Sequence, residues 1–286
     1  MSKVFIAMSI VLLMMPELAI QQSNSDAHAD VGTIIVLLIS KDKAYLAADS
    51  RVGHENGQFD DHGCKVIEVT PKLLFAAAGR VAFGPHSSRF SAEDEAYSAV
   101  RDAMSSDLGT LKNEPMLSLA ADWGMKVAMQ FQTAYSNGLT VLASDGRFVP
   151  IVQGIFVSVD DSNSVKYAEA PVYYDPPRPG FRGMLFKSHS EVEEVPEGYL
   201  NIQDYGQTGI VDEFKNLSTS RAREDRAAWL GEKRELLSSE YAIHLVEKTI
   251  ELNPDKFVVG GPIDVAEITP SNGVHWIRRK DECRQP

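Results

Sequence analysis

The chain has 286 residues, which is enough for one large domain or two small ones. Its 44% hydrophobic and 24% charged residues are typical of a globular protein and exclude a collagen-like, coiled-coil or wholly disordered chain. The formal net charge of -12 argues against a broad phosphate-binding surface, because nucleic-acid affinity depends on clustered Lys and Arg. We therefore expect a packed domain with no nucleic-acid partner.

The first residues have the pattern of an export signal. An apolar run from Val4 to Met15, too short to span a bilayer comfortably, precedes the small residues of Ala27-His28-Ala29, where a signal peptidase would cleave. We predict a signal peptide over residues 1–29, a single domain over residues 30–286, and a secreted or periplasmic protein without a stable membrane span. The alternative is an uncleaved anchor, lengthened by Leu18, Ala19 and Ile20.

Four short apolar runs rich in β-branched residues open the domain. They form two expected hairpins, with polar or Pro-containing turns between the strands. The predicted strands are Thr33–Ser40, Ala44–Ala48, Lys65–Val69 and Leu73–Ala78.

Helical and strand patterns then alternate in blocks. Apolar residues at helical spacing predict helices over 91–104 and 116–135, and later a helix in two pieces over 218–253. Because strands and helices come in blocks without a βαβ alternation, the order predicts an α+β fold with antiparallel sheets. The remaining predicted strands are 149–159, 165–174, 200–205, 256–259, 263–268 and 274–278, and Lys280 to Pro286 is the only candidate tail.

Two cysteines, Cys64 and Cys283, are too few for a disulfide-dense scaffold or a cysteine metal site. An oxidising compartment would allow them to pair, but the sequence does not place their Cα atoms. Two free buried thiols are at least an equal alternative, so the sequence leaves the pairing open, and we expect Cys64 in the core.

The segment from Gly32 to Gly79 has an informative spacing. Asp49 follows Thr33 by 16 positions, Lys65 follows Asp49 by 16, and Gly79 follows Lys65 by 14. In this register the segment resembles the opening of proteasome β subunits, with Gly32-Thr33 where that family removes its propeptide. The resemblance implies an N-terminal-nucleophile (Ntn) hydrolase with a four-layer αββα sandwich of two antiparallel sheets between helices, in which residues 32–79 form the catalytic strands.

Later segments match this family less closely. Residues 240–250 resemble its late helix, and Gly260-Gly261 resembles its Gly-Gly strand entry. Gln207-Thr208-Gly209 is the best match to a Gly-Ser-Gly element, with Thr208 in place of serine. Residues 138–235 are longer than in the family and form a poorly matched, insert-bearing region.

The resemblance implies a catalytic role for each matched residue. Thr33 is the nucleophile and, through its free α-amino group with an ordinary pKa of about 8, also the base. Lys65 lowers the pKa of that amine, and Asp49 holds the lysine. The backbone N–H of Gly79 receives the oxyanion, a contact worth about 3 kcal/mol, and Thr208 is a supporting hydroxyl.

The implied reaction is hydrolysis of a peptide or other amide bond through an acyl-enzyme, without a metal or organic cofactor. Self-processing at Gly32-Thr33, or a trimming peptidase, must first expose the threonine amine. The family assembles into rings, so a homo-oligomer is a possible partner. By the same resemblance the primary specificity pocket is uncharged and suits an apolar side chain; its positions are Val52, Gly63, Ile67, Ala77 and Val81.

Two alternatives stay open. One is a catalytically silent Ntn-fold scaffold or binding protein, which the uncut leader Asp30-Val31-Gly32 favours. The other is an amidase for a small molecule or cell-wall amide, which shares the mechanism and differs in its substrate. Taken singly, Thr33 could merely start a strand, Asp49 cap a turn and Lys65 be a solvated edge lysine, but their joint register favours a hydrolase.

Overall fold

The computed structural model describes residues 33–53, 58–83, 90–105, 115–134, 150–160, 162–175, 185–188, 190–254 and 258–283. The predicted signal peptide and the Gly32 side of the predicted processing site lie outside these residues. Within the described ranges, no helix is both long and apolar enough to cross a membrane.

One antiparallel sheet combines the start and the end of the described chain. Its strands lie in the order β13-β1-β2-β14-β15. In the β1–β2 hairpin Ile35 lies opposite Ala48, and the pairing extends to Asp49, whose N–H donates to the Ile34 carbonyl at 3.2 Å. Asp49 therefore lies opposite the residue that follows Thr33. The strands are β1 (Ile34–Ile39), β2 (Ala44–Ala48), β13 (Asn201–Gly206), β14 (Asp264–Thr269) and β15 (Gly273–Arg278).

The second sheet has the order β11-β10-β9-β6-β5, and β12 pairs with β10. Its strand β6 ends at Gly79, opposite Val152 on β9. The strands are β5 (Val66–Thr70), β6 (Leu73–Gly79), β9 (Val152–Val159), β10 (Val165–Asp175), β11 (Leu185–Ser188) and β12 (Glu191–Glu194). Two short pairs lie outside the sheets: β3 (Val52–Gly53) with β4 (Phe59–Asp60), and β7 (Ala82–Phe83) with β8 (Phe90–Ser91).

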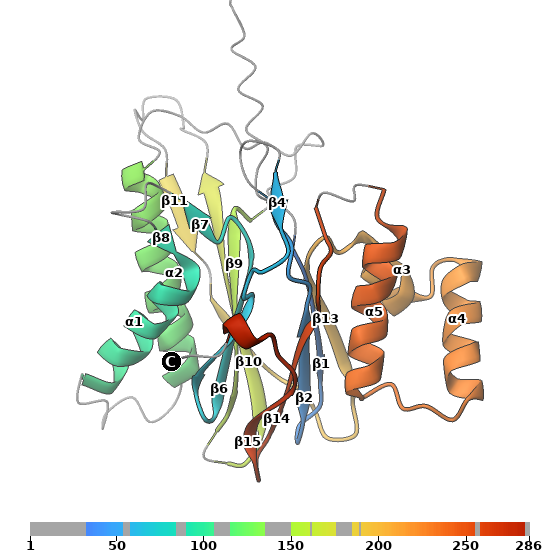
Figure 1. Cartoon of the computed structure of the whole chain (residues 1–286). Coiled ribbons are helices and arrows are strands. Elements are labelled where there is room, and N and C mark those ends of the chain that lie inside the picture. The colour runs from blue at the N-terminus through green and yellow to red at the C-terminus, as the bar shows by residue number, and fades with distance from the viewer. Residues whose placement is uncertain are drawn as a thin grey trace, which may run out of the picture.

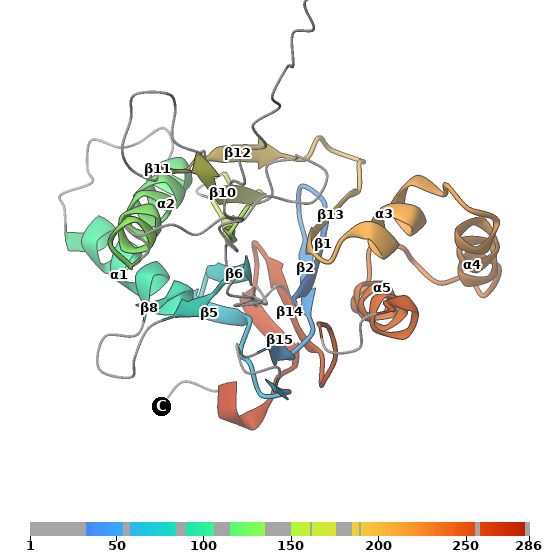
Figure 2. The same ribbon diagram turned by 90° about the horizontal axis from the view of Figure 1, so that it is seen from above.

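The two sheets stack face to face, and helices cover their outer faces (Figures 1 and 2). Helices α1 (Ala92–Ser105) and α2 (Pro115–Ala134) cover the sheet that contains β6. Helix α5 (Ser239–Leu252) covers β1 and β2, with α3 (Gly209–Asn216) and α4 (Ser220–Gly231) beside it. The predicted α+β class with antiparallel sheets is confirmed.

Strand β1 shows why its sequence is a continuous apolar run. Ile35, Leu37 and Ile39 pack between the two sheets, whereas Ile34, Val36 and Leu38 pack beneath α5. Because successive strand side chains point to opposite faces, a strand covered on both sides needs apolar residues at every position. All six side chains are fully buried.

Besides the two clusters on the faces of β1, a third apolar cluster lies between β6, β9, β10 and the helices α1 and α2. Trp123 of α2 is fully buried there against Phe75 and Phe156, with ring centroids 5.4 and 6.2 Å away. Its indole N–H donates to the Ala92 carbonyl at 3.0 Å, which satisfies the one polar atom of the ring.

The structure differs from the sequence prediction in several elements. Helix α3 and strands β11 and β12 are additional, and the helix predicted over 218–253 is indeed two helices, α4 and α5. The strand predicted at 256–259 is wrong for Val258 and Val259, which lie in a turn. The segment reaches the end of β2 through the Gly260 carbonyl, which accepts from the N–H groups of Ser50 and Arg51, both at 3.0 Å, and not through a strand ladder. Residues 256 and 257 of the predicted strand lie outside the described residues.

A disulfide joins Cys64 to Cys283, which decides between the two alternatives that the sequence left open. The two Cα atoms are 5.5 Å apart, a normal separation for a bridge. The bonded residues are 219 positions apart in sequence, and a short 3-10 turn after β15 (Asp281–Cys283) brings them together. Cys64 is partly exposed at the edge of the sheet and is not a core residue.

The described part of the insert-bearing region 138–235 contributes to the main architecture. Strands β9 and β10 lie inside one sheet, and β13 pairs directly with β1 in the other. The region therefore supplies core strands as well as the added helices α3 and α4.

Candidate active site

A fully buried carboxylate lies where β2 ends. Asp49 Oδ1 accepts from Lys65 Nζ at 2.7 Å and from the Ile34 N–H at 3.0 Å. Its Oδ2 accepts from the Gly260 N–H at 2.9 Å and from the Arg51 N–H at 3.4 Å. One side chain thus connects the start of β1, the end of β2, the start of β5 and the loop before β14.

Lys65 is 3% exposed and directly precedes β5. Burial is the main influence on its ammonium and lowers its pKa, while the Asp49 carboxylate acts in the opposite direction. The nearby Lys280 lowers the pKa further. A lysine with a lowered pKa can exchange a proton closer to neutral pH than an exposed one, so this pair is a candidate for proton chemistry.

Thr33 lies beside this carboxylate and is 3% exposed. Its carbonyl oxygen accepts from the Gln207 N–H at 2.8 Å, and the next N–H, of Ile34, donates to Asp49. Gly206 has φ +87°, and a Cβ on it would lie 1.8 Å from the Thr33 carbonyl oxygen. Both polar atoms of the Thr33–Ile34 peptide are therefore bound, in a position that requires glycine next to it.

Two further predicted positions lie at strand and helix ends. Gly79 has φ +91° at the end of β6, and a Cβ there would lie 2.4 Å from the Ile151 carbonyl oxygen. Thr208 is the residue before α3; its N–H donates to the Gly206 carbonyl at 3.0 Å, and its side chain makes no capping hydrogen bond. Thr208 thus lies next to the Gln207 contact that holds Thr33.

The five predicted pocket residues fall into two groups. Val52 and Gly63 touch one another, since a Cβ on Gly63 would lie 2.3 Å from the Val52 methyl carbon. Ile67 and Ala77 are buried in the cluster beneath α1 and α2, and Val81 packs against that cluster. The described contacts place Ile67 and Ala77 in the core.

A second buried ion pair, which the sequence did not indicate, lies beside the first. Lys280 Nζ contacts Asp264 Oδ2 at 2.6 Å and the Gly63 carbonyl at 2.8 Å, and it also donates to Ser50 Oγ. The Asp264 and Lys280 side chains are 1% and 8% exposed. Lys280 was predicted to begin a tail, and it instead lies inside the molecule.

The Gly-Gly pair after α5 has a packing explanation. Arg51 binds Asp61 through two hydrogen bonds of 2.7 and 2.9 Å and lies 4.0 Å above the Phe59 ring centroid. A Cβ on Gly260 would lie 2.5 Å from the guanidinium carbon, and one on Gly261 would lie 2.8 Å from the Asp61 Cβ. The loop can approach this ion pair because neither position has a side chain.

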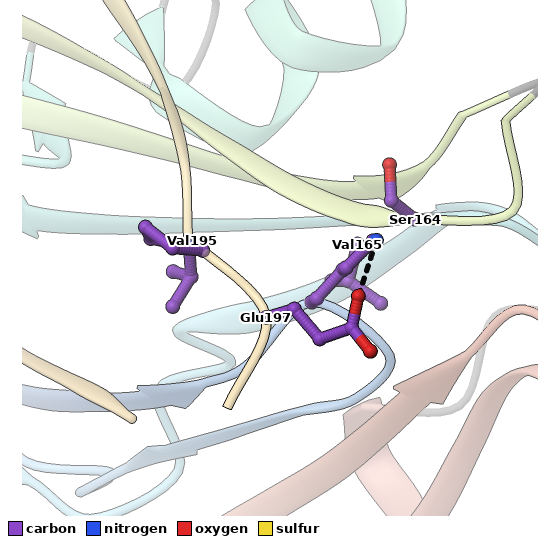
Figure 3. A pocket seen from close by; sticks show the side chains of 6 residues that line it. Ser164, Val165, Val195 and Glu197 are labelled. Carbon is purple, nitrogen blue, oxygen red and sulfur yellow. Dashed lines mark hydrogen bonds and ion pairs between the residues drawn. The ribbon is translucent and has the colours of Figure 1, made fainter. Parts of the chain in front are cut away.

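Figure 3 shows a separate cavity of about 330 Å³. Its lining includes Lys41 of the β1–β2 turn, which is at the opposite end of β1 from Thr33. Val195 and Glu197 come from the segment between β12 and β13, and Ser164 and Val165 lie at the start of β10. Lys41 and Pro196 complete its lining, and Lys41 forms an exposed ion pair of 3.2 Å with Glu197. None of the predicted catalytic residues lines it.

The described residues contain no group of three or more His, Cys, Asp or Glu side chains arranged to hold a metal ion. A scan against protein-family models and a search of curated proteins found no match.

Proposed function

We propose that this chain is an Ntn hydrolase of the proteasome β-subunit type, in which Thr33 hydrolyses peptide or other amide bonds. The observation that carries the proposal is the buried Asp49 carboxylate, which binds both the Lys65 ammonium and the N–H that follows Thr33. The sequence register of these residues and their hydrogen bonds support the same assignment independently. The two stacked sheets with helices outside them are compatible with the αββα sandwich of that family.

In this mechanism the amine of a processed Thr33 takes the proton from its own hydroxyl. The hydroxyl oxygen attacks the substrate carbonyl carbon, and the carbonyl electrons move to its oxygen, which the Gly79 N–H stabilises. Collapse breaks the C–N bond, and the leaving amine takes the proton from the threonine ammonium. Water then repeats the sequence on the resulting ester and regenerates Thr33.

Lys65 and Asp49 support the first step. A cation near the threonine favours the neutral form of the amine and the alkoxide that develops at the hydroxyl. Asp49 holds Lys65 and, through the Ile34 N–H, also fixes the backbone of the nucleophile. Thr208 is the proposed supporting hydroxyl, because its side chain is not used to cap α3.

The buried ion pair favours an active enzyme over a silent scaffold. Burying a carboxylate and an ammonium costs several kcal/mol for each ion, and apolar residues of similar volume often stabilise a core equally well or better. A chain that served only as a scaffold would have no evident need for the pair at this position. Export is also part of the proposal, because a disulfide forms and persists in oxidising compartments.

The test begins with the N-terminus of the protein expressed from its full sequence. Intact mass and N-terminal sequencing would be measured for the wild type, Thr33→Ala and Thr33→Ser. The hydrolase proposal predicts that the wild type begins at Thr33, that Thr33→Ser is also processed, and that Thr33→Ala keeps the preceding glycine.

A second measurement tests whether Thr33 is reactive even if another peptidase, and not the chain itself, removes the leader. A hydrophobic β-lactone should acylate Thr33: its hydroxyl oxygen bonds to the lactone carbonyl, the ring C–O bond breaks, and the ring oxygen takes the proton. The mass therefore increases by that of the whole probe. A wild type that keeps its leader and does not react would contradict the hydrolase and favour the silent scaffold.

A further inference from the structure

We infer that Lys280 is a positioning residue of this active site and that the Cys64–Cys283 disulfide anchors it there. The inference rests on the proposed function, since it assigns to the C-terminal segment the task of holding Asp49 and Lys65 in place. Lys280 itself touches neither the nucleophile nor a substrate in this proposal.

The Lys280 ammonium joins the two chain segments that carry the catalytic pair. Its contact with Ser50 Oγ reaches the residue next to Asp49. Its 2.8 Å contact with the Gly63 carbonyl reaches the residue two positions before Lys65. The Lys280 ammonium therefore connects the segment that carries Asp49 with the segment that carries Lys65.

The same junction includes the loop that binds Asp49 from the other side. Ser50 Oγ donates to the Pro262 carbonyl, and the Ser50 N–H donates to the Gly260 carbonyl at 3.0 Å. The Gly63 N–H donates to the Ser50 carbonyl at 3.0 Å. Lys280 thus completes a closed set of contacts around the residue that follows Asp49.

Two connections hold Lys280 in this position. Asp264 accepts from the Lys280 ammonium at 2.6 Å and from its backbone N–H at 3.0 Å. The disulfide then links Cys283, whose N–H donates to the Lys280 carbonyl at 3.1 Å, to Cys64. Cys64 lies between Gly63 and Lys65. The covalent bond therefore joins the segment that carries Lys280 to the segment whose Gly63 carbonyl Lys280 contacts.

The experiment compares acylation of processed Thr33 by the β-lactone in the wild type and in the double variant Lys280→Gln with Asp264→Asn, both expressed from the full sequence. This variant keeps hydrogen-bonding groups and avoids an isolated buried charge. Because sub-ångström placement of catalytic groups governs rate, we expect a fall of about tenfold or more in the maximal rate of acylation. The probe concentration at half-maximal rate should change by less than about twofold, because neither substituted residue is among the predicted pocket residues.

A matched control is the double variant Lys166→Gln with Asp160→Asn, which removes a 2.8 Å ion pair at the opposite end of the strands. It should acylate at the wild-type rate. If the Lys280 variant also acylates at that rate, the positioning role is wrong while the hydrolase stands. If the wild type is not acylated at Thr33, the proposed function and this inference both fail.

A second variant covers the case in which the first does not fold. Cys64→Ser with Cys283→Ser keeps Lys280 but removes its anchor, and we expect the maximal acylation rate to fall by about tenfold, as it should in the wild type treated with dithiothreitol. The Cys→Ser variant should not respond to dithiothreitol. An unchanged rate in both the variant and the reduced wild type would overturn the anchoring role.

Discussion

Replacing Asp49 with alanine tests the buried centre of the site most directly. The substitution removes the acceptor of four hydrogen bonds and leaves the Lys65 ammonium buried without its carboxylate. Breaking a buried ion pair by removing one partner costs about 3–5 kcal/mol. The N–H groups of Ile34 and Gly260 also lose their acceptor, so we expect a value near the top of that range at pH 7.

The cost should depend on pH in a defined direction. Burial lowers the pKa of Lys65 below its ordinary value of 10.5, and removing Asp49 removes an influence that raises it. Between the folded pKa and 10.5 the unfolded chain binds a proton that the folded chain does not, so stability rises with pH. The destabilisation caused by Asp49→Ala should therefore be smaller at pH 9.5 than at pH 7.

Urea unfolding of the wild type and Asp49→Ala at both pH values measures this. The control is Asp49→Leu with Lys65→Met, which removes both charges and should cost less than the single substitution at pH 7. A second control, Glu197→Ala, breaks an exposed ion pair and should cost less than about 1 kcal/mol. If Asp49→Ala lowers the free energy of unfolding by less than about 1 kcal/mol, and by the same amount at pH 7 and pH 9.5, the reasoning is refuted.

Three further predictions concern other parts of the fold. Reducing the Cys64–Cys283 bridge should lower the free energy of unfolding by up to about 5 kcal/mol, because the bridge joins residues 219 positions apart; urea unfolding with and without dithiothreitol measures this, and no loss would contradict it. Burial raises the pKa of Asp204 from 3.8 to about 6, because the buried site favours the neutral carboxylic acid. The stability that the neutral acid contributes is fully present below pH 3.8 and is lost as the pH rises through 6. Asp204→Asn should therefore be more stable than the wild type above pH 7, by about 3 kcal/mol, and the difference should disappear near pH 3.5 in thermal or urea unfolding. Gly206→Ala should cost about 2 kcal/mol or more and slow acylation by the β-lactone, because its Cβ would lie 1.8 Å from a backbone oxygen at φ +87°. Gly209→Ala, whose Cβ would meet nothing within 4 Å, is the control and should be tolerated.

Local patterns predicted much of the architecture because the strands and helices differ in period. The β1 run, the β5–β6 hairpin and the apolar spacing of α2 are visible in single stretches of sequence. The sequence does not reveal helix α3, because it has only 8 residues and only two residues separate it from the preceding strand. Its helical period spans about two turns, which is too short to distinguish from a loop.

The candidate site was predictable where its residues share one register. Thr33 and Asp49 lie at the ends of the paired strands β1 and β2, so their spacing alone brings them together. Lys65 precedes β5 of the other sheet and reaches Asp49 across the two stacked sheets. Long-range partners carry no such signal. The Lys280–Asp264 pair contacts Ser50 and Gly63 across more than 200 positions, and only the folded sheet brings β15 back to the first hairpin.

The position of the two buried Lys–Asp pairs next to Thr33 favours a functional role for them. The Lys65–Asp49 and Lys280–Asp264 pairs are both almost fully buried, and each carries a large desolvation cost. Packing alone would be served as well by apolar side chains, as the three neighbouring clusters around β1 and β6 show. The charged pairs instead occur together at one end of the sheets, linked through Ser50 and adjacent to Thr33. Their cost is understandable if they fix the proton chemistry and position of that threonine.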